Sequence, residues 1–212
     1  MIDEDGGLRA FFENAEQLSR ILPSLGERCG SEHLAVRQET PAAKEPWFSR
    51  EEWEPVLIGK RFIAAPSWLP VSSTGRFRLT VDTVLTFGTG RHESTQLAIE
   101  TLEDRIRGGE TVLDIGCGSG ILSEAAILLG AATVFGCDLD PRAAEEWEKR
   151  LPGKAIVGSA DAFRTASADI VVANLTTAIL NEIEPDLRRI VKPGGKLILS
   201  GFLASTPPAH FT

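Results

Sequence analysis

The chain has 212 residues, and 30 acidic against 22 basic side chains give it a formal net charge of −8. Its 42% of hydrophobic and 25% of charged residues are ordinary for a globular protein, which excludes disordered and collagen-like classes. The acidic balance argues against a non-specific nucleic-acid binder, because such proteins carry a basic patch, and it permits a basic protein partner.

Two segments precede the largest part of the chain. Residues 1–45 predict a strand, a helix capped by Asn14, and a second strand, with the apolar residues of the helix on one face. Residues 46–74 are punctuated by prolines and rich in tryptophan, and this composition predicts a linker.

Residues 75–212 alternate apolar, strand-like runs with helical patterns and predict an α/β domain. The expected strands are 111–115, 133–138, 155–157, 170–174 and 196–200. The expected helices are 95–106, 121–129, 141–150 and 177–190. Such an alternation predicts a parallel sheet with helices on both faces, in which ligands bind at the carboxyl ends of the strands.

The cysteines and the termini define the cellular setting. Cys29, Cys117 and Cys137 show no C-x-x-C spacing, so they predict neither a disulfide framework nor a metal site. The amino terminus lacks the basic and apolar regions of a signal peptide, and the longest apolar run, 125–137, is too short to span a membrane. We therefore expect a cytoplasmic protein that does not bind membranes.

The strongest local motif is the glycine loop VLDIGCGSGI at 112–121. An apolar strand leads into Gly116, Gly118 and Gly120, and a helix follows. Glycines let the backbone approach a ligand, and the helix amino terminus offers N–H groups to it. Nicotinamide enzymes have G-x-G-x-x-G, whereas the compact G-x-G-x-G is typical of S-adenosylmethionine enzymes. The alternative is a tight structural turn.

An acidic residue ends the next expected strand. Asp138 follows Gly116 by 22 residues, about the spacing that a nucleoside requires. Its two carboxylate oxygens can accept hydrogen bonds from both ribose hydroxyls. Asp140 is better interpreted as a helix N-cap, because Pro141 follows it.

The third and fourth strands are also followed by polar residues. Asp161 can read the adenine amino group, with an exposed loop carboxylate as the alternative. Asn174 can accept an N–H of an incoming amine and leave the nitrogen lone pair aimed at a transferred methyl group. Thr176 shares this segment and is a candidate catalytic residue with it; the alternative for Asn174 is a capping or turn residue.

The segment LTFGTGRHEST at 85–95 precedes a helix. Phe87 precedes Gly88, and Thr89 lies between Gly88 and Gly90. Two glycines next to an aromatic residue suggest a loop that folds against a ligand. Thr95, or Ser94 before it, can cap the helix while its hydroxyl contacts a cofactor. His92 is interpreted as a structural hydrogen-bond donor in preference to a base.

Together these segments resemble the PrmA family, methyltransferases that act on protein eleven of the large ribosomal subunit. The resemblance rests on IGKRFIAAPSWLP, TFGTGRHESTQ, the stretch from VLDIGCGSG to CDLDP, DIVVANLTTAIL and SGFLAS. It implies a Rossmann-like class I methyltransferase domain that binds S-adenosyl-L-methionine through Thr95, Gly116, Asp138 and Asn174. It also implies lysine and N-terminal amines of a ribosomal protein as acceptors.

The chain departs from the family pattern in its expected acceptor pocket. Arg91 and Glu93 flank His92 where the family usually has threonine and proline, and Leu175-Thr176 follow Asn174 where it usually has Ile-Leu. A methyltransferase with another protein or small-molecule acceptor, or an inactive S-adenosylmethionine-binding protein, is therefore the alternative.

The family's full architecture is expected to be incomplete in this chain. Residues 1–45 resemble the second half of the family's amino-terminal substrate domain, and the carboxy-terminal strands of its seven-stranded sheet are expected to be missing. An unfinished sheet edge must be exposed or covered, which indicates a homodimer through that edge, a truncated gene or reduced activity.

Overall fold

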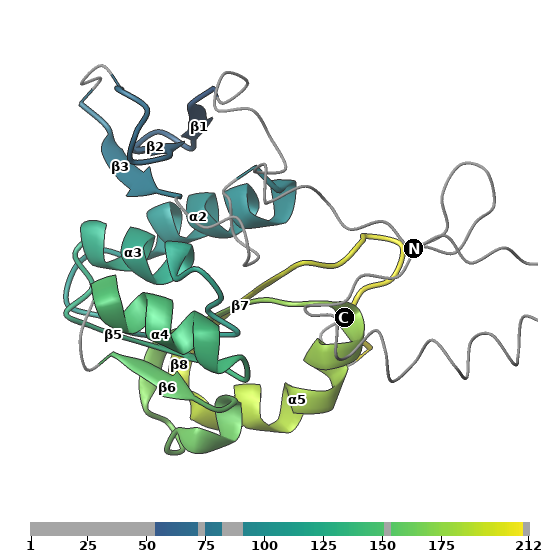
Figure 1. Cartoon of the computed structure of the whole chain (residues 1–212). Coiled ribbons are helices and arrows are strands. Elements are labelled where there is room, and N and C mark those ends of the chain that lie inside the picture. The colour runs from purple at the N-terminus through teal and green to yellow at the C-terminus, as the bar shows by residue number, and fades with distance from the viewer. Residues whose placement is uncertain (1–53, 72–74, 82–90, 151–153, 210–212) are drawn as a thin grey trace, which may run out of the picture. The chain divides into compact units, whose positions relative to one another are not determined.

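The structure is a computed structural model that describes residues 54–71, 75–81, 91–150 and 154–209. All of these residues belong to one compact unit of the chain (Figure 1). The domain expected over residues 1–45 lies outside the described residues, as do Phe87 and Thr89.

A five-stranded parallel sheet forms the centre of this unit. Its strands are β4 (Thr111–Ile115), β5 (Thr133–Asp138), β6 (Ala155–Val157), β7 (Ala168–Asn174) and β8 (Val191–Ser200). Their order is β6-β5-β4-β7-β8, so the chain reverses its direction of travel across the sheet after β6. This reversal makes β4 the central strand, with β5 and β7 as its neighbours. Ligands of such sheets bind at the reversal point.

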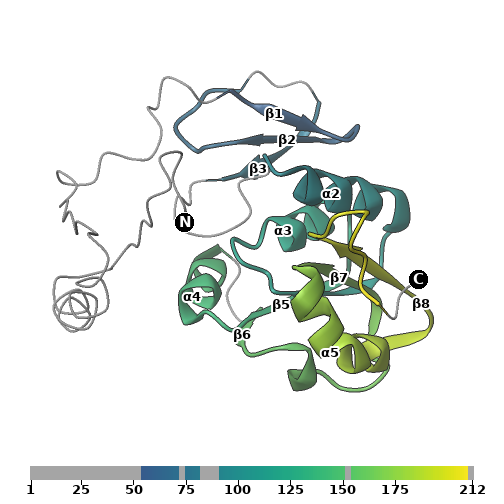
Figure 2. The same cartoon turned by 90° about the vertical axis from the view of Figure 1, so that its right-hand side faces the viewer.

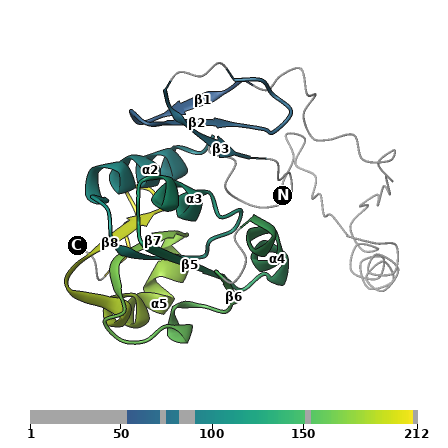
Figure 3. The same cartoon turned by 90° about the vertical axis from the view of Figure 1, so that its left-hand side faces the viewer.

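Helices cover both faces of the sheet, as the sequence predicts. They are α2 (Glu93–Arg105), α3 (Ile121–Leu128), α4 (Pro141–Arg150) and α5 (Thr177–Ile190), with a short 3-10 helix η2 (Ala160–Ala162). Figures 2 and 3 show α2 and α3 on one side of the sheet and α5 on the other.

Alternation along β4 explains how one strand serves both faces. Val112 packs into the cluster that includes α2 and α3, whereas Leu113 and Ile115 pack into the cluster that includes α5. Side chains of a strand point alternately to its two faces, so the continuous apolar run is buried on both sides. The same alternation turns Asp114 toward α3, where it is fully buried.

The structure differs from the linker expected over residues 46–74. Strands β1 (Val56–Ile58) and β2 (Phe62–Ala65) lie within this range and join β3 (Phe77–Thr80) in a small sheet. Ile58 and Phe62 are fully buried in the cluster that includes α2 and α3. The small sheet therefore covers the outer side of these helices (Figure 2). Strands of three or four residues between turns are too short to show a periodic pattern.

Two negative findings concern the described residues as a set. No helix among them is long and apolar enough to cross a membrane. Within the same residues, no group of three or more metal-binding side chains comes together, and Cys117 and Cys137 are buried free thiols.

Candidate functional site

The carboxyl ends of three adjacent strands bring the predicted motifs together. Ile115 at the end of β4 pairs with Cys137 of β5 on one side and with Ala173 of β7 on the other. Asp138 and Asn174 each come one residue after these partners. The glycine loop, the acidic residue and the amide therefore converge at one edge of the sheet, although they are far apart in the sequence.

The glycine loop after β4 depends on its glycines for conformation and for space. Gly116, Gly118 and Gly120 have φ angles of 73°, 50° and 76°, in the left-handed region that favours glycine. A Cβ on Gly116 would lie 2.5 Å from a methyl group of Leu175, and one on Gly120 would lie 1.8 Å from the indole of Trp147. Leu175 and Trp147 thus pack against the loop, and its last glycine, Gly120, is the N-cap residue of α3.

Asp138 is held at the tip of β5 by two main-chain groups. Its Oδ2 accepts a hydrogen bond from the Gly118 N–H, and its Oδ1 accepts one from the Asp140 N–H, both at 2.9 Å. An ionised carboxylate has about four acceptor positions, so each oxygen can accept one more hydrogen bond. This arrangement fits the predicted ribose contact and orients the carboxylate toward the glycine loop.

Asp140 caps α4, which confirms its predicted role. Its Oδ1 accepts a hydrogen bond from the Arg142 N–H at 3.0 Å, in the first turn of the helix. The side chain of Arg142 also bonds the carboxylate, and this hydrogen bond is the main reason that the pKa of Asp140 is lowered. Both oxygens of the Asp140 carboxylate are therefore engaged in hydrogen bonds at the start of α4.

A hydrogen bond between two distant residues fixes the amide at the end of β7. Asn174 Nδ2 donates to Thr95 Oγ1 at 3.1 Å, across 79 positions of the sequence. Thr95 is buried in the first turn of α2, where its N–H donates to the His92 carbonyl. Because the amide nitrogen is engaged, Asn174 Oδ1 is the atom left to accept a hydrogen bond from a ligand.

Asp114 is a buried acidic residue beneath the glycine loop that sequence reasoning did not single out. Its Oδ2 accepts hydrogen bonds from the N–H and the hydroxyl of Ser123, at 3.1 and 2.6 Å. Its Oδ1 has no partner among the described residues. Burial raises the pKa of Asp114 to about 7, against the two bonds from Ser123. The signal available in the sequence was an aspartate inside an otherwise apolar strand.

Trp147 and Gly201 were also missed as parts of the site. Trp147 is fully buried on α4 and contacts the glycine loop, whereas Gly201 follows β8 and touches Asn174. A Cβ on Gly201 would lie 2.8 Å from Asn174 Oδ1. The segment SGFLAS carried the signal for Gly201, because it is one of the segments on which the family resemblance rests. For Trp147 the only signal was its place on the apolar face of a helix.

The remaining predicted residues lie near this edge without contacts that test their roles. Asp161 is exposed on η2, directly after β6. Thr176 is exposed as the N-cap residue of α5, and its side chain makes no capping hydrogen bond. Their roles in adenine binding and catalysis remain predictions.

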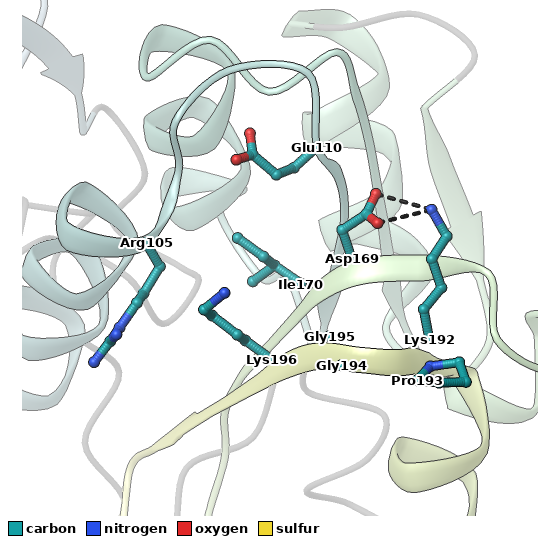
Figure 4. Close-up of a pocket in the computed structure, with 9 residues that line it drawn as sticks. All are labelled: Arg105, Glu110, Asp169, Ile170, Lys192, Pro193, Gly194, Gly195 and Lys196. Carbon is teal, nitrogen blue, oxygen red and sulfur yellow. Dashed lines mark hydrogen bonds and ion pairs between the residues drawn. The ribbon is translucent and has the colours of Figure 1, made fainter.

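A hollow of about 220 Å³ lies at the opposite end of the sheet (Figure 4). Lys192 Nζ bonds both carboxylate oxygens of Asp169 at 2.9 Å, and the Thr111 N–H also donates to Asp169 Oδ2. The bond from Lys192 is the main reason that the pKa of Asp169 is lowered. These contacts join the starts of β4, β7 and β8, at the end of the sheet away from the glycine loop.

Comparisons with known proteins agree with this geometry. The family model of the ribosomal protein L11 methyltransferase (PrmA) matches residues 1–208. A ribosomal protein L11 methyltransferase from Methylococcus capsulatus is 38% identical over 205 residues, which are 93% of this chain and 70% of that protein. One from Paraburkholderia xenovorans is 40% identical over 159 residues, which are 74% of this chain and 53% of that protein.

A solved structure extends the likeness to three dimensions. The crystal structure of a ribosomal protein L11 methylase from Lactobacillus delbrueckii subsp. bulgaricus matches with a TM-score of 0.64 and 28% identity, over 71% of this chain and 81% of that one. This likeness confirms the Rossmann-like class I methyltransferase fold. The chain spans between about half and about 70% of the length of the curated relatives named above. The chain belongs to the ribosomal protein L11 methyltransferase (PrmA) family.

Proposed function

We propose that this chain transfers a methyl group from S-adenosyl-L-methionine to lysine or N-terminal amines of ribosomal protein L11. The observation that carries the proposal is the hydrogen bond from Asn174 Nδ2 to Thr95 Oγ1. It fixes an amide oxygen at the same sheet edge as the glycine loop and Asp138. The printed names of the relatives support the acceptor, and the net charge of −8 suits a basic ribosomal protein.

The residues at this edge fit the proposed cofactor. Gly116, Gly118 and Gly120 add no side-chain atoms of their own to the loop, so its backbone can lie close to a ligand. Asp138 offers two carboxylate oxygens to the ribose, and the amino terminus of α3 favours polar or negative ligand groups. The hydroxyl of Thr95 lies beside Asn174, and we expect it to contact the cofactor next to the acceptor.

Asn174 would align the acceptor. When bound, the cofactor supplies an electrophilic methyl group: the amine lone pair forms the new N–C bond, the C–S electron pair stays on sulfur, and the ammonium product loses a proton to water. Asn174 Oδ1 accepts an N–H of the amine, which restricts the direction of the nitrogen lone pair. Holding reacting groups in line contributes much of the rate of such transfers, and no strong general base is required.

A labelled-methyl assay tests the proposal. Purified chain is incubated with S-adenosylmethionine carrying a labelled methyl group and with recombinant ribosomal protein L11, and incorporation into L11 is expected. Cofactor binding with transfer only to other cell components would indicate a different acceptor. Cofactor binding without any transfer would indicate an inactive S-adenosylmethionine-binding protein. A protein that does not bind the cofactor would overturn the proposal.

We also propose that two copies of the chain pair through the outer edge of β8, and that the protein acts in the cytoplasm, where ribosomal proteins are made. Within the described residues β8 is an end strand of the sheet. Its first six residues include Lys192, Pro193 and Lys196, which discourage pairing, whereas 197–200 carries no charge. Light scattering on the purified chain is expected to give the mass of a dimer, and the mass of a monomer would contradict the pairing.

A further inference from the structure

Ser200, the last residue of β8, has a hydroxyl oxygen that is buried and has no hydrogen-bond partner among the described residues. Buried hydroxyl groups normally find a partner, and an exception calls for an explanation. We propose that Ser200 Oγ is a second acceptor for the incoming amine, next to Asn174 Oδ1. This inference rests on the proposed function and specifies how its site positions the substrate.

The sheet register places Ser200 beside Asn174. The two residues are paired across β7 and β8, and paired residues of neighbouring parallel strands point to the same face. Asn174 points toward α2, because it bonds Thr95 there. Ile198, two residues before Ser200, packs in the same cluster as Ile99 of α2, so the period of two also turns Ser200 toward α2.

The main chain holds these two strand ends together. The Leu175 N–H donates to the Ser200 carbonyl at 3.0 Å, one residue beyond the pairing of Asn174 with Ser200. Gly201 then turns with a φ of 92°, and a Cβ there would lie 2.8 Å from Asn174 Oδ1. The end of β8 is therefore in direct contact with the residue that we propose to align the amine.

Two acceptors match the chemistry of a primary amine. A neutral primary amine has two N–H groups and one lone pair. Asn174 Oδ1 accepts one N–H, because Nδ2 is engaged with Thr95, and Ser200 Oγ has lone pairs to accept the other. When both N–H groups are held, the lone pair has one direction left, which is the alignment that methyl transfer requires.

Successive transfers to one nitrogen differ in the number of N–H groups that must be held. A monomethylated amine has a single N–H, so one acceptor is sufficient to orient it. Loss of the Ser200 hydroxyl should therefore slow the first methyl transfer more than a second one on the same nitrogen. A residue that only supported the fold would affect both transfers equally.

A binding experiment tests the position of Ser200 without any catalysis. Sinefungin carries an amino group where the cofactor carries its methyl group, and S-adenosylhomocysteine carries neither. Calorimetry on the wild-type chain should show that sinefungin binds more tightly than S-adenosylhomocysteine. In Ser200→Ala this preference should fall at least fivefold with unchanged affinity for S-adenosylhomocysteine, and Ser200→Thr, which keeps a hydroxyl, should retain it.

Ser167→Ala is the matched control. The Ser167 hydroxyl oxygen is also buried and has no partner in the part of the chain that the structure describes, but it precedes β7 at the opposite end of the sheet. This variant should keep the wild-type preference for sinefungin. A wild-type chain that binds S-adenosylhomocysteine without preferring sinefungin would overturn the inference. An unchanged preference in Ser200→Ala, or an equal loss in both serine variants, would overturn it as well.

Methyl transfer gives the second readout. With L11 as acceptor, mass spectrometry over time should show a first transfer at least tenfold slower in Ser200→Ala, and a wild-type rate in Ser167→Ala. A first transfer at the wild-type rate in Ser200→Ala would contradict the role of Ser200. If the wild-type chain transfers no methyl group to L11, the proposed acceptor fails, and the sinefungin comparison still decides the position of Ser200.

Discussion

The indole of Trp147 lies directly against the backbone of Gly120, so that a Cβ on Gly120 would be 1.8 Å from Cε3. Trp147 comes from the middle of α4, whereas Gly120 ends the glycine loop and begins α3. A fully buried aromatic side chain therefore supports the loop at the point where the proposed cofactor would approach. This contact allows only glycine at position 120.

Gly120→Ala is expected to lower the free energy of unfolding by at least about 2 kcal/mol, because the new methyl group meets the indole and φ is 76°. Chemical denaturation measures this loss. Trp147→Leu removes the obstructing ring, so the double variant should lose less stability than the sum of the two single variants. Additive losses would mean that backbone strain at Gly120 dominates.

Asp138→Ala is expected to weaken S-adenosylmethionine binding at least tenfold, or about 1.4 kcal/mol, because the ribose loses its carboxylate. Calorimetry measures the affinity. Asp140→Ala is the matched control: it removes a neighbouring carboxylate that only caps α4, so it should lower stability by about 1 kcal/mol and leave affinity nearly unchanged. Unchanged affinity in Asp138→Ala would refute the ribose contact.

Asn174→Ala is expected to reduce methyl transfer to L11 at least tenfold while the affinity for S-adenosylmethionine changes much less. The amide oxygen is proposed to act on the acceptor, and its nitrogen is engaged with Thr95. Single-turnover rates and calorimetry measure the two effects. Asn181→Ala, on α5, is the control and should leave both unchanged. The opposite pattern in Asn174→Ala would mean that the amide only holds the cofactor.

The raised pKa of Asp114 predicts that the free energy of unfolding falls as the pH rises. Burial raises its pKa in the folded chain to about 7 from the ordinary aspartate value of 3.8, so the folded state binds its proton more tightly than the unfolded state. The contribution is complete below about pH 4 and is lost as the pH rises through about 7. A pKa difference of this size corresponds to a contribution to stability on the order of a few kcal/mol.

Denaturation at several pH values tests this dependence. Asp114→Asn should remove most of the decline between pH 4 and 7. Ser123→Ala should extend the decline above pH 7, because it removes the hydroxyl hydrogen bond that lowers the pKa of Asp114. A decline that persists in Asp114→Asn would assign the pH dependence to other groups.

The sequence predicted the main sheet well, because its strands and helices follow clear periods. β4, β5, β6, α4 and α5 have the bounds that the pattern indicated. β8 begins at Val191, five residues before the expected start, and its added residues include Pro193, Gly194 and Gly195, which show no strand pattern. In the structure a register shift between β7 and β8 keeps this segment in the strand.

The sequence predicted the site residues that lie at the ends of strands. It did not predict those whose role depends on contacts between different elements. Asp138 and Asn174 follow apolar strands, so the rule for parallel sheets places them at one edge. The support from Trp147 and the buried hydroxyl of Ser200 depend on which residues meet across elements. A periodic pattern gives the buried face of an element, but it does not give the partner of each side chain.

The two hydrogen bonds to Asp138 have a consequence for the entropy of ligand binding. The Gly118 and Asp140 N–H groups immobilise the carboxylate in the folded chain, so its rotational freedom is lost during folding and not on binding. Immobilising a side chain at an interface otherwise costs about 0.5–1.5 kcal/mol. A nucleoside thus meets a preorganised acceptor, and a change that broke either of these two hydrogen bonds would weaken binding without removing a single ligand contact.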